Sequence, residues 1–301
     1  MTIKRIEIND IISFLGDRIL SVDGDTNGIY IDNLADVERV CETTLDWINP
    51  SKIDKQEIAQ GSKARVILVD ETISPIEGKV LIHVSNPKVA LADVGNHFFV
   101  EKILPGIHPS TILGPNARIG KGVYIGPYCV IGNATIGDNC VIDSNVRIHD
   151  CVSIGNNCRI KAGAVLGSDG FGFEKDAAGN GFRFPQIGSL IIGDYVEIGA
   201  NTCVDRGALA DTVIGDYTKI NNLCHIAHNN VIGKNVEIAG CVNISGSCII
   251  DDDVWISPNV SLRGWQHIHR GVTIGTGAVV TKDIPEGETW VGNPARKLEK
   301  K

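Results

Sequence analysis

A polar stretch, Asn-Asn-Leu-Cys-His-Ile-Ala-His-Asn at 221–229, contains the side chains best suited to acid–base chemistry. His228 follows the aliphatic Ile226 by two positions, and Gly246 follows the aliphatic Ile244 in the same way. An imidazole can remove a proton from an attacking amine or hydroxyl, and a glycine N–H beside it can stabilise an oxyanion. If the two lie together, they predict acyl transfer. The alternative is a solvated or hydrogen-bonded surface histidine.

The surrounding sequence has a period of six residues, which would bring every third unit of the chain to the same edge. Between 214 and 280 every sixth residue is aliphatic: Ile214, Ile220, Ile226, Ile232, Ile238, Ile244, Ile250, Ile256, Leu262, Ile268, Ile274 and Val280. Neither a helix nor an ordinary strand has this period. Three six-residue units form a triangular coil, and stacked coils are joined as parallel sheet at a spacing of ~4.8 Å. The pattern predicts a mainly β protein, a left-handed parallel β-helix, with His228 and Gly246 one coil apart on the same edge.

The chain divides into three predicted parts. Residues 1–105 lack the period and suggest a small α/β domain, with helices at 8–15 and 89–99 and strands at 64–69 and 79–84. Residues 106–282 form the β-helix, with about eight coils at the strand spacing of parallel sheet. A loop insertion at 167–190 holds four of the seven phenylalanines, which favours a loop that packs on something over a plain surface loop. Residues 283–301 are expected to cap the last coil.

Composition narrows the class of protein further. The net charge of −8 argues against nucleic-acid binding. No apolar run is long enough to span a membrane, and the start of the chain does not resemble a signal peptide, so we expect a cytoplasmic protein. Five of the nine cysteines precede an inward aliphatic residue by two positions and are expected to be core thiols: Cys129, Cys140, Cys158, Cys224 and Cys248. No zinc-type spacing occurs, so neither a metal nor a permanently bound cofactor is expected.

Four motifs in order resemble the UDP-3-O-acylglucosamine N-acyltransferases of lipid A synthesis. They are Gly-Ser-Asp-Gly-Phe-Gly-Phe at 167–173 with Pro185-Gln186, Ile-Gly-Asp-Tyr-Val-Glu-Ile-Gly-Ala-Asn-Thr at 192–202, Asp-Arg-Gly-Ala-Leu at 205–209, and Ile-Ala-His-Asn at 226–229. The resemblance implies a homotrimer with clefts between neighbouring prisms and an N-terminal domain that helps to hold a uridine nucleotide. It also implies that His228 is the general base and that the Gly246 backbone amide serves the oxyanion.

The matched segments also suggest residues that bind the acceptor. These substrate-binding candidates are Asn222, Asp205, Arg206, Phe171, Phe173 and Trp47. Trp47 stands one place away from the aromatic residue that the family stacks on uracil, and burial in the core is an equal alternative. Lys52 and Lys63 are candidates to meet phosphates, although lone lysines are usually solvated.

The C-terminal part departs from the family. Its second histidine aligns with Trp265, with His267 and His269 just beyond, and its Gly-Met-Gly-Met stretch reads Gly-Thr-Gly-Ala at 275–278. Residues 274–285 and 292–295 instead resemble the ending of coenzyme A-dependent hexapeptide acetyltransferases, in place of C-terminal helices that engage acyl carrier protein. The donor-binding candidates are therefore Gly264, Thr276, Ala278, Lys282 and Arg296.

These features predict an N-acyltransferase that moves an acyl group from a short or medium acyl-CoA, such as a 3-hydroxyacyl-CoA, to a nucleotide-linked amino sugar. Its product would enter a cell-surface glycan such as O-antigen. One alternative is the lipid A enzyme itself, with an acyl carrier protein donor. Another is a non-catalytic β-helix that binds or scaffolds. The residues leave open N- or O-acylation, the sugar, the nucleotide base and the acyl length.

Overall fold

The structure is a computed structural model that describes residues 5–299. The chain separates into two compact units, Met1–Lys102 and Ile103–Lys301. Residues 1–4, part of the start considered above for a signal peptide, and residues 300–301, the end of the expected cap, lie outside the described residues. No helix in the described part is long and apolar enough to cross a membrane.

The first unit is built on a four-stranded sheet of order β2-β6-β5-β4. Its elements are β1 (Ile6–Glu7), α1 (Ile8–Leu15), β2 (Ile19–Asp23), β3 (Tyr30–Ile31), β4 (Leu45–Trp47), α2 (Lys55–Gly61), β5 (Val66–Val69), β6 (Val80–Val84), α3 (Pro87–Val94) and the π-helix η3 (Gly95–Phe99). The predicted helix at 8–15 is confirmed, and it ends at Gly16 with φ 51°. Strands β5 and β6 are buried along their whole length, which accounts for their unbroken apolar sequence.

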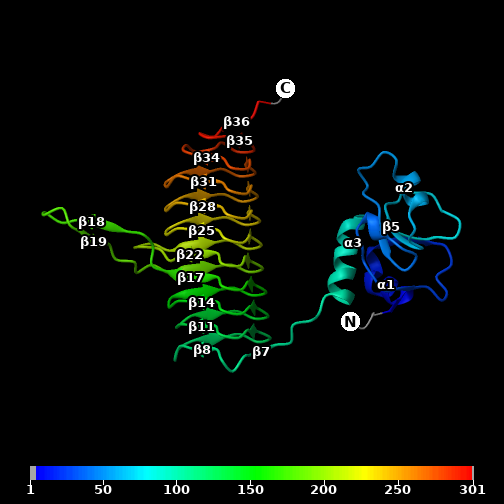
Figure 1. The fold of residues 1–301 in the computed structure, drawn as a ribbon, viewed down its shortest axis with the longest axis horizontal. Coiled ribbons are helices and arrows are strands. Elements are labelled where there is room, and N and C mark those ends of the chain that lie inside the picture. The colour runs from blue at the N-terminus through cyan, green and yellow to red at the C-terminus, as the bar shows by residue number, and fades with distance from the viewer. Residues whose placement is uncertain (1–4, 300–301) are drawn as a thin grey trace. The chain divides into compact units, whose positions relative to one another are not determined.

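The second unit is a β-helix whose coils stack three parallel faces (Figure 1). The first face contains β7 (Gly106–Ile107), β10 (Tyr124–Ile125), β13 (Val141–Ile142), β16 (Arg159–Ile160), β21 (Glu197–Ile198), β24 (Lys219–Ile220), β27 (Glu237–Ile238), β30 (Trp255–Ile256), β33 (Thr273–Ile274), β35 (Thr289–Val291) and β36 (Arg296–Lys297). The second face contains β8 (Ile112–Leu113), β11 (Val130–Ile131), β14 (Arg147–Ile148), β17 (Val165–Ser168), β22 (Cys203–Asp205), β25 (His225–Ile226), β28 (Asn243–Ile244), β31 (Ser261–Leu262) and β34 (Val279–Val280). The third face contains β9 (Arg118–Ile119), β12 (Thr135–Ile136), β15 (Val152–Ile154), β20 (Leu190–Ile192), β23 (Thr212–Ile214), β26 (Val231–Ile232), β29 (Ile249–Ile250) and β32 (His267–Ile268).

The six-residue period produces this left-handed β-helix directly. Beyond the first coil, where Ile107 and Leu113 are exposed, the aliphatic residues of the units point inward, and the five cysteines predicted as core thiols are buried with them. The corners use left-handed backbone, for example at Asn235 with φ 54°. Many corners are closed by an Asp or Asn of the next coil, as where Asp252 Oδ1 accepts the Lys234 N–H at 2.7 Å. Such a side chain satisfies a backbone donor that the turn would otherwise leave unpaired.

The insertion leaves the coil stack between β17 and β20. It forms the hairpin of β18 (Phe173–Lys175) and β19 (Gly181–Arg183), which projects sideways from the prism (Figure 1). At the other end, β35 pairs in parallel with β33, and β36 pairs antiparallel with β35. The segment expected to be a cap therefore continues the first face as sheet.

Candidate functional site

His228 lies at the corner that follows β25, and two glycines confine its ring. A Cβ built on Gly246 would lie 2.8 Å from Cε1 and 2.9 Å from Nε2 of His228. A Cβ built on the buried Gly170, which belongs to the insertion, would lie 2.6 Å from the Cβ of His228. The predicted pairing of His228 with Gly246 is therefore present in the fold. Gly170 was not among the predicted site residues, because spacing within the repeat says nothing about the path of an inserted loop.

Asn229 determines which nitrogen of the His228 ring carries the proton. Its Oδ1 lies 2.9 Å from His228 Nδ1 and accepts the Ala208 N–H at 3.0 Å. Its Nδ2 donates to the Ala210 carbonyl at 2.8 Å, which fixes the orientation of the amide. Because an amide oxygen only accepts, the neutral imidazole donates from Nδ1 and keeps the lone pair of Nε2. The basic nitrogen is therefore the one beside Gly246.

The backbone N–H of Gly246 is free to bind a developing negative charge. Within residues 5–299 it has no hydrogen-bond acceptor, whereas the Gly246 carbonyl accepts the Trp265 N–H at 3.2 Å. At some other corners, such as Lys234, a side chain one coil further on accepts the corresponding N–H, but here that position is Gly264, which has no side chain. Gly264, predicted to bind the donor, thus lies on the same corner as His228 and Gly246. An open amide next to a basic nitrogen is the arrangement that acyl transfer needs.

Asp205, at the end of β22, places a buried carboxyl group near this histidine. It is 7% exposed, and burial raises its pKa from 3.8 to about 6, although the charges of His225 and His228 act to lower it. Its Oδ2 lies 3.9 Å from Nε2 of His225. A carboxylate that interacts with His228 favours the positive charge that forms when the ring accepts a proton.

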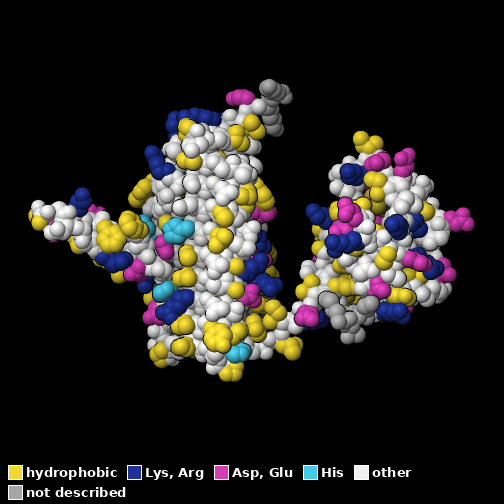
Figure 2. All heavy atoms as spheres, viewed as in Figure 1, with side chains coloured by type: hydrophobic (Ala, Val, Ile, Leu, Met, Phe, Trp, Pro, Cys, Tyr) yellow, Lys and Arg dark blue, Asp and Glu magenta, His cyan; other side chains and the backbone are white. Residues whose placement is uncertain are grey.

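A pocket of about 780 Å³ opens beside His228, and its walls are mainly apolar. Phe171 and Phe173 of the insertion line it, as do Leu209 and Trp265. Phe171 is 85% exposed and Trp265 is 82% exposed, which is unusual for rings of this size. Figure 2 shows histidines on the prism next to hydrophobic side chains at the base of the projecting hairpin. The volume and the walls suit an acyl chain.

Gln186, between the hairpin and β20, adds a polar group to this pocket. It is 8% exposed, its Nε2 donates to the Phe184 carbonyl at 3.3 Å, and its Oε1 is buried with no partner in the described part of the chain. An unpaired buried acceptor is costly, so Gln186 is suited to receive a donor from a substrate. The Pro-Gln pair marked this position in the sequence as part of a motif but did not indicate its role.

Three other predicted residues have structural roles in the prism. Asn222 and Thr276 lie on a different corner from His228, where Asn222 Oδ1 accepts a hydrogen bond from the Ala200 N–H at 2.7 Å. Arg206 Nε donates to the Gly188 carbonyl at 2.7 Å and so holds the end of the insertion. Ala278 is completely buried in the core, so its side chain cannot contact a donor. That prediction was wrong for the side chain, because the position two before an inward residue also faces the interior.

The remaining candidates are distributed over the C-terminal coils. Lys282 is exposed one coil after Gly264, and Arg296 is exposed on β36. His267 and His269, considered as replacements for the family's second histidine, both contact Asp251. Trp265, which aligns with that histidine, lines the pocket instead.

Trp47 belongs to the first unit, where it is partly buried. Its ring packs against the buried cluster, and it also lines a hollow of about 330 Å³ together with Asp46 and Lys63. Trp47 and Lys63, which were expected to contact the base and the phosphates of a nucleotide, thus line the same hollow. Lys52 does not line this hollow.

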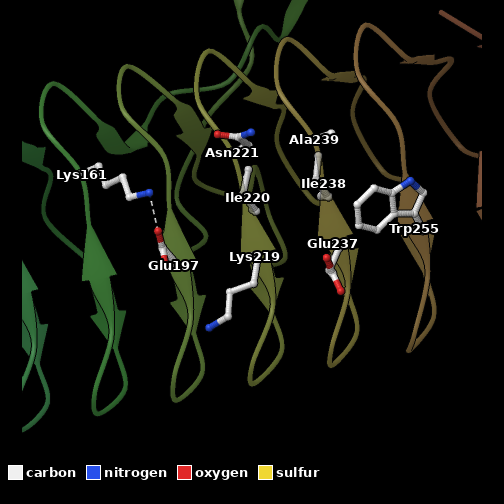
Figure 3. Close-up of a pocket in the computed structure, with 9 residues that line it drawn as sticks. All are labelled: Lys161, Glu197, Lys219, Ile220, Asn221, Glu237, Ile238, Ala239 and Trp255. Carbon is white, nitrogen blue, oxygen red and sulfur yellow. Dashed lines mark ion pairs between the residues drawn. The ribbon is translucent and has the colours of Figure 1, made fainter. Parts of the chain in front are cut away.

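A second hollow on the prism, of about 270 Å³, lies along the first face (Figure 3). Successive strands of this face present side chains of alternating charge, and Lys161 Nζ pairs with Glu197 Oε1 at 2.5 Å. Trp255 closes one end of the row, and Lys219 and Glu237 stand between (Figure 3). None of its lining residues is a histidine, cysteine or serine, so it offers no general base of the His228 kind.

Comparison with known proteins agrees with this site. Residues 133–168 match the model described as bacterial transferase hexapeptide (six repeats). UDP-3-O-acylglucosamine N-acyltransferase 1 of Francisella tularensis subsp. holarctica is 39% identical over 273 residues, 81% of this chain and 79% of that protein. UDP-3-O-acylglucosamine N-acyltransferase of Coxiella burnetii is 36% identical over 286 residues, 87% and 81% of the two chains.

A solved structure shares the fold as well. The UDP-N-acetylglucosamine acyltransferase of Francisella novicida superimposes with a TM-score of 0.59 at 26% identity, covering 64% of this chain and 70% of that one. An acyltransferase relationship argues against the non-catalytic alternative and confirms the resemblance drawn from the four motifs. With a free amide, a basic nitrogen and an apolar pocket at one corner, this chain belongs to the UDP-3-O-acylglucosamine N-acyltransferase family and is an acyltransferase.

Proposed function

We propose that the chain transfers a 3-hydroxyacyl group from an acyl carrier protein thioester to the amino group of a UDP-linked 3-O-acylglucosamine. The observation that carries this proposal is the free Gly246 N–H beside the unprotonated Nε2 of His228, at the edge of an apolar pocket. The relatives' names give UDP-3-O-acylglucosamine, which supports the lipid A alternative over the acyl-CoA and O-antigen interpretation preferred from the sequence.

In this mechanism the thioester carbonyl lies with its oxygen toward the Gly246 N–H. The neutral amine attacks the carbonyl carbon while His228 Nε2 removes one of its protons, and the Gly246 N–H stabilises the oxyanion. Collapse of the tetrahedral intermediate breaks the C–S bond, and the proton on His228 passes to the departing thiolate. Asp205 favours the imidazolium while it exists. No bound cofactor takes part in these steps.

The pocket sets the proposed acyl specificity. Phe171 and Trp265 are too exposed to be explained by an acetyl group, whereas a long chain would cover them. We propose that the unpaired Gln186 Oε1 accepts the 3-hydroxyl of this chain or a donor of the sugar. The nucleotide is proposed to stack on Trp47 with its phosphates toward Lys63. Clefts of a homotrimer would bring acceptor and donor together, and Asn222 is proposed to contact the substrate from a neighbouring protomer.

The test measures thiol release with UDP-3-O-(3-hydroxyacyl)glucosamine and either a 3-hydroxyacyl carrier protein or the matching acyl-CoA. Turnover with the carrier protein, reduced about 10²- to 10⁴-fold in His228→Ala, is expected. His108→Ala is the matched control, since the exposed side chain of this histidine bonds only to Ser110 in the described residues. Turnover with acyl-CoA alone would overturn the donor assignment, and an active His228→Ala would overturn the mechanism.

A further inference from the structure

A second group of side chains, apart from the His228 pocket, meets at the C-terminal end of the third face. We call Asp251, His267 and His269 the Asp-His-His cluster. Asp251 Oδ1 lies 3.0 Å from Nε2 of His267, and Asp251 Oδ2 lies 3.4 Å from Nδ1 of His269. One ligand atom from each residue lies within 4.8 Å of the other two. The two imidazole rings are 3.8 Å apart between centroids.

The repeat explains why these three residues meet. His267 and His269 are two positions apart on one extended segment, so their side chains leave the same side of it. Asp251 precedes His269 by one full coil, and the β29–β32 pairing of Ile249 with His267 keeps the two coils in register. A search for zinc spacing along the sequence does not find such a group, because its members belong to different coils.

Neighbouring carboxylates have other partners, which leaves Asp251 to the imidazoles. Asp252 Oδ1 accepts the Lys234 N–H at 2.7 Å, and Asp253 pairs with Arg270 at 2.7 Å. Asp283 Oδ1 accepts the His267 backbone N–H at 2.8 Å, which holds that residue in place. Among the described residues, the Asp251 carboxylate therefore pairs with no cationic group other than the two imidazoles. The segment that carries both imidazoles is held by backbone hydrogen bonds.

We propose that the Asp-His-His cluster binds one divalent transition-metal ion, of the Zn²⁺, Co²⁺ or Ni²⁺ class. Two imidazoles and a carboxylate suit these ions, whereas Ca²⁺ and Mg²⁺ prefer oxygen ligands. With bonds of about 2.0–2.1 Å, tetrahedral ligand atoms lie roughly 3.3 Å apart. The two carboxylate-to-imidazole distances, 3.0 and 3.4 Å, are close to this value, although each involves a different oxygen of Asp251. The side chains are 35–42% exposed, so the ion can enter and retains an open position. A bound ion would join the coil of β29 to the coil of β32.

The test uses the untagged full-length chain, stripped with a chelator and titrated with Zn²⁺ or Co²⁺ in equilibrium dialysis. One ion per chain, a higher Tm and a Co²⁺ visible spectrum typical of nitrogen ligands are expected. His269→Ala and Asp251→Asn should each weaken the affinity by about tenfold or more. His108→Ala, which removes a histidine elsewhere, should bind like the unaltered chain.

Two outcomes would overturn the proposal. One is the absence of stoichiometric binding to the unaltered chain. The other is equal affinity in His269→Ala, which would mean that the ion binds elsewhere. Circular dichroism and Tm of the metal-free forms show whether each variant is folded. If His269→Ala does not fold, Asp251→Asn, which keeps the size of the side chain, still tests the proposal. Because dialysis needs no turnover, this test stands or falls independently of the acyl-transfer proposal.

Discussion

Asp205→Asn should stabilise the fold at pH 8 but not at pH 4. Burial raises the pKa of Asp205 from 3.8 to about 6. Since one pKa unit corresponds to about 1.36 kcal/mol, ionising this group in the folded state costs about 3 kcal/mol. A carboxyl whose pKa is raised on folding contributes stability below its unfolded pKa and loses that contribution as pH rises through its folded pKa. The loss therefore occurs between about pH 4 and pH 6–7, and the neutral asparagine avoids it.

The assay is urea unfolding of both chains at pH 4 and pH 8. Any poor fit of the buried amide lowers the stability of Asp205→Asn equally at both pH values. The stability of Asp205→Asn relative to the unaltered chain should therefore rise by about 3 kcal/mol from pH 4 to pH 8, and this rise measures the cost of the buried charge alone. Asp176→Asn serves as a control of opposite sign, since hydrogen bonds from Asn180 lower the pKa of the exposed Asp176. A stability difference that does not change with pH would refute the argument that Asp205 is desolvated.

The same substitution should reduce activity, because the charge that destabilises the fold also favours protonated His228. We expect kcat of Asp205→Asn to fall about tenfold at pH 8, equivalent to about 1.4 kcal/mol in the barrier. A variant that is both more stable and equally active would show that Asp205 does not assist the base. Gain of stability with loss of activity is the combination expected for a residue kept for function.

Two further predictions concern the walls of the pocket and the orientation of the base. In the unaltered chain kcat/KM should rise about fourfold for each CH₂ added to the acyl donor, because burial of a CH₂ contributes about 0.8 kcal/mol. In Trp265→Ala the rise per CH₂ should be smaller. An equal rise per CH₂ in both chains would contradict contact between the acyl chain and Trp265. Asn229→Ala should lower kcat about 100-fold, because the His228 ring loses the group that orients it. Asn229→Asp keeps an acceptor for His228 Nδ1 and should retain more activity. Steady-state kinetics measures both variants, and equal losses of kcat would contradict the orienting role of Asn229.

The fold and the centre of the site could be predicted because the repeat is visible in the sequence. Inward aliphatic residues at every sixth position define the coil, and a coil of three such units places Gly246 on His228 without knowledge of the structure. The same pattern places the Ala278 side chain in the core, so this side chain was a poor candidate for contact with a donor.

The insertion could not be placed in this way. Its contacts with the prism depend on tertiary packing, so neither the approach of Gly170 to the His228 ring nor the unpaired Oε1 of Gln186 follows from spacing. The aromatic content of 167–190 favoured a loop that packs on something, but Phe171, Phe173 and Phe182 are exposed in the structure. Phe171 and Phe173 line the pocket instead of packing in a core. What the sequence lacked was the direction in which the loop turns.

Gly264 has no side chain that could accept the Gly246 N–H from the next coil, and its part in keeping that amide open can be tested. Gly264→Ala and Gly264→Asp share one steric problem, since a Cβ at this position lies 2.8 Å from the Gly246 carbonyl oxygen. Only the aspartate can also accept the Gly246 N–H, as Asp252 accepts that of Lys234. Gly264→Asp should therefore be more stable than Gly264→Ala by about 1 kcal/mol in urea unfolding. Its kcat should nevertheless be about 10²- to 10³-fold lower, because the oxyanion has lost its donor. If the two variants turned over at the same rate, the Gly246 amide would not be that donor, and the open corner would have no part in catalysis.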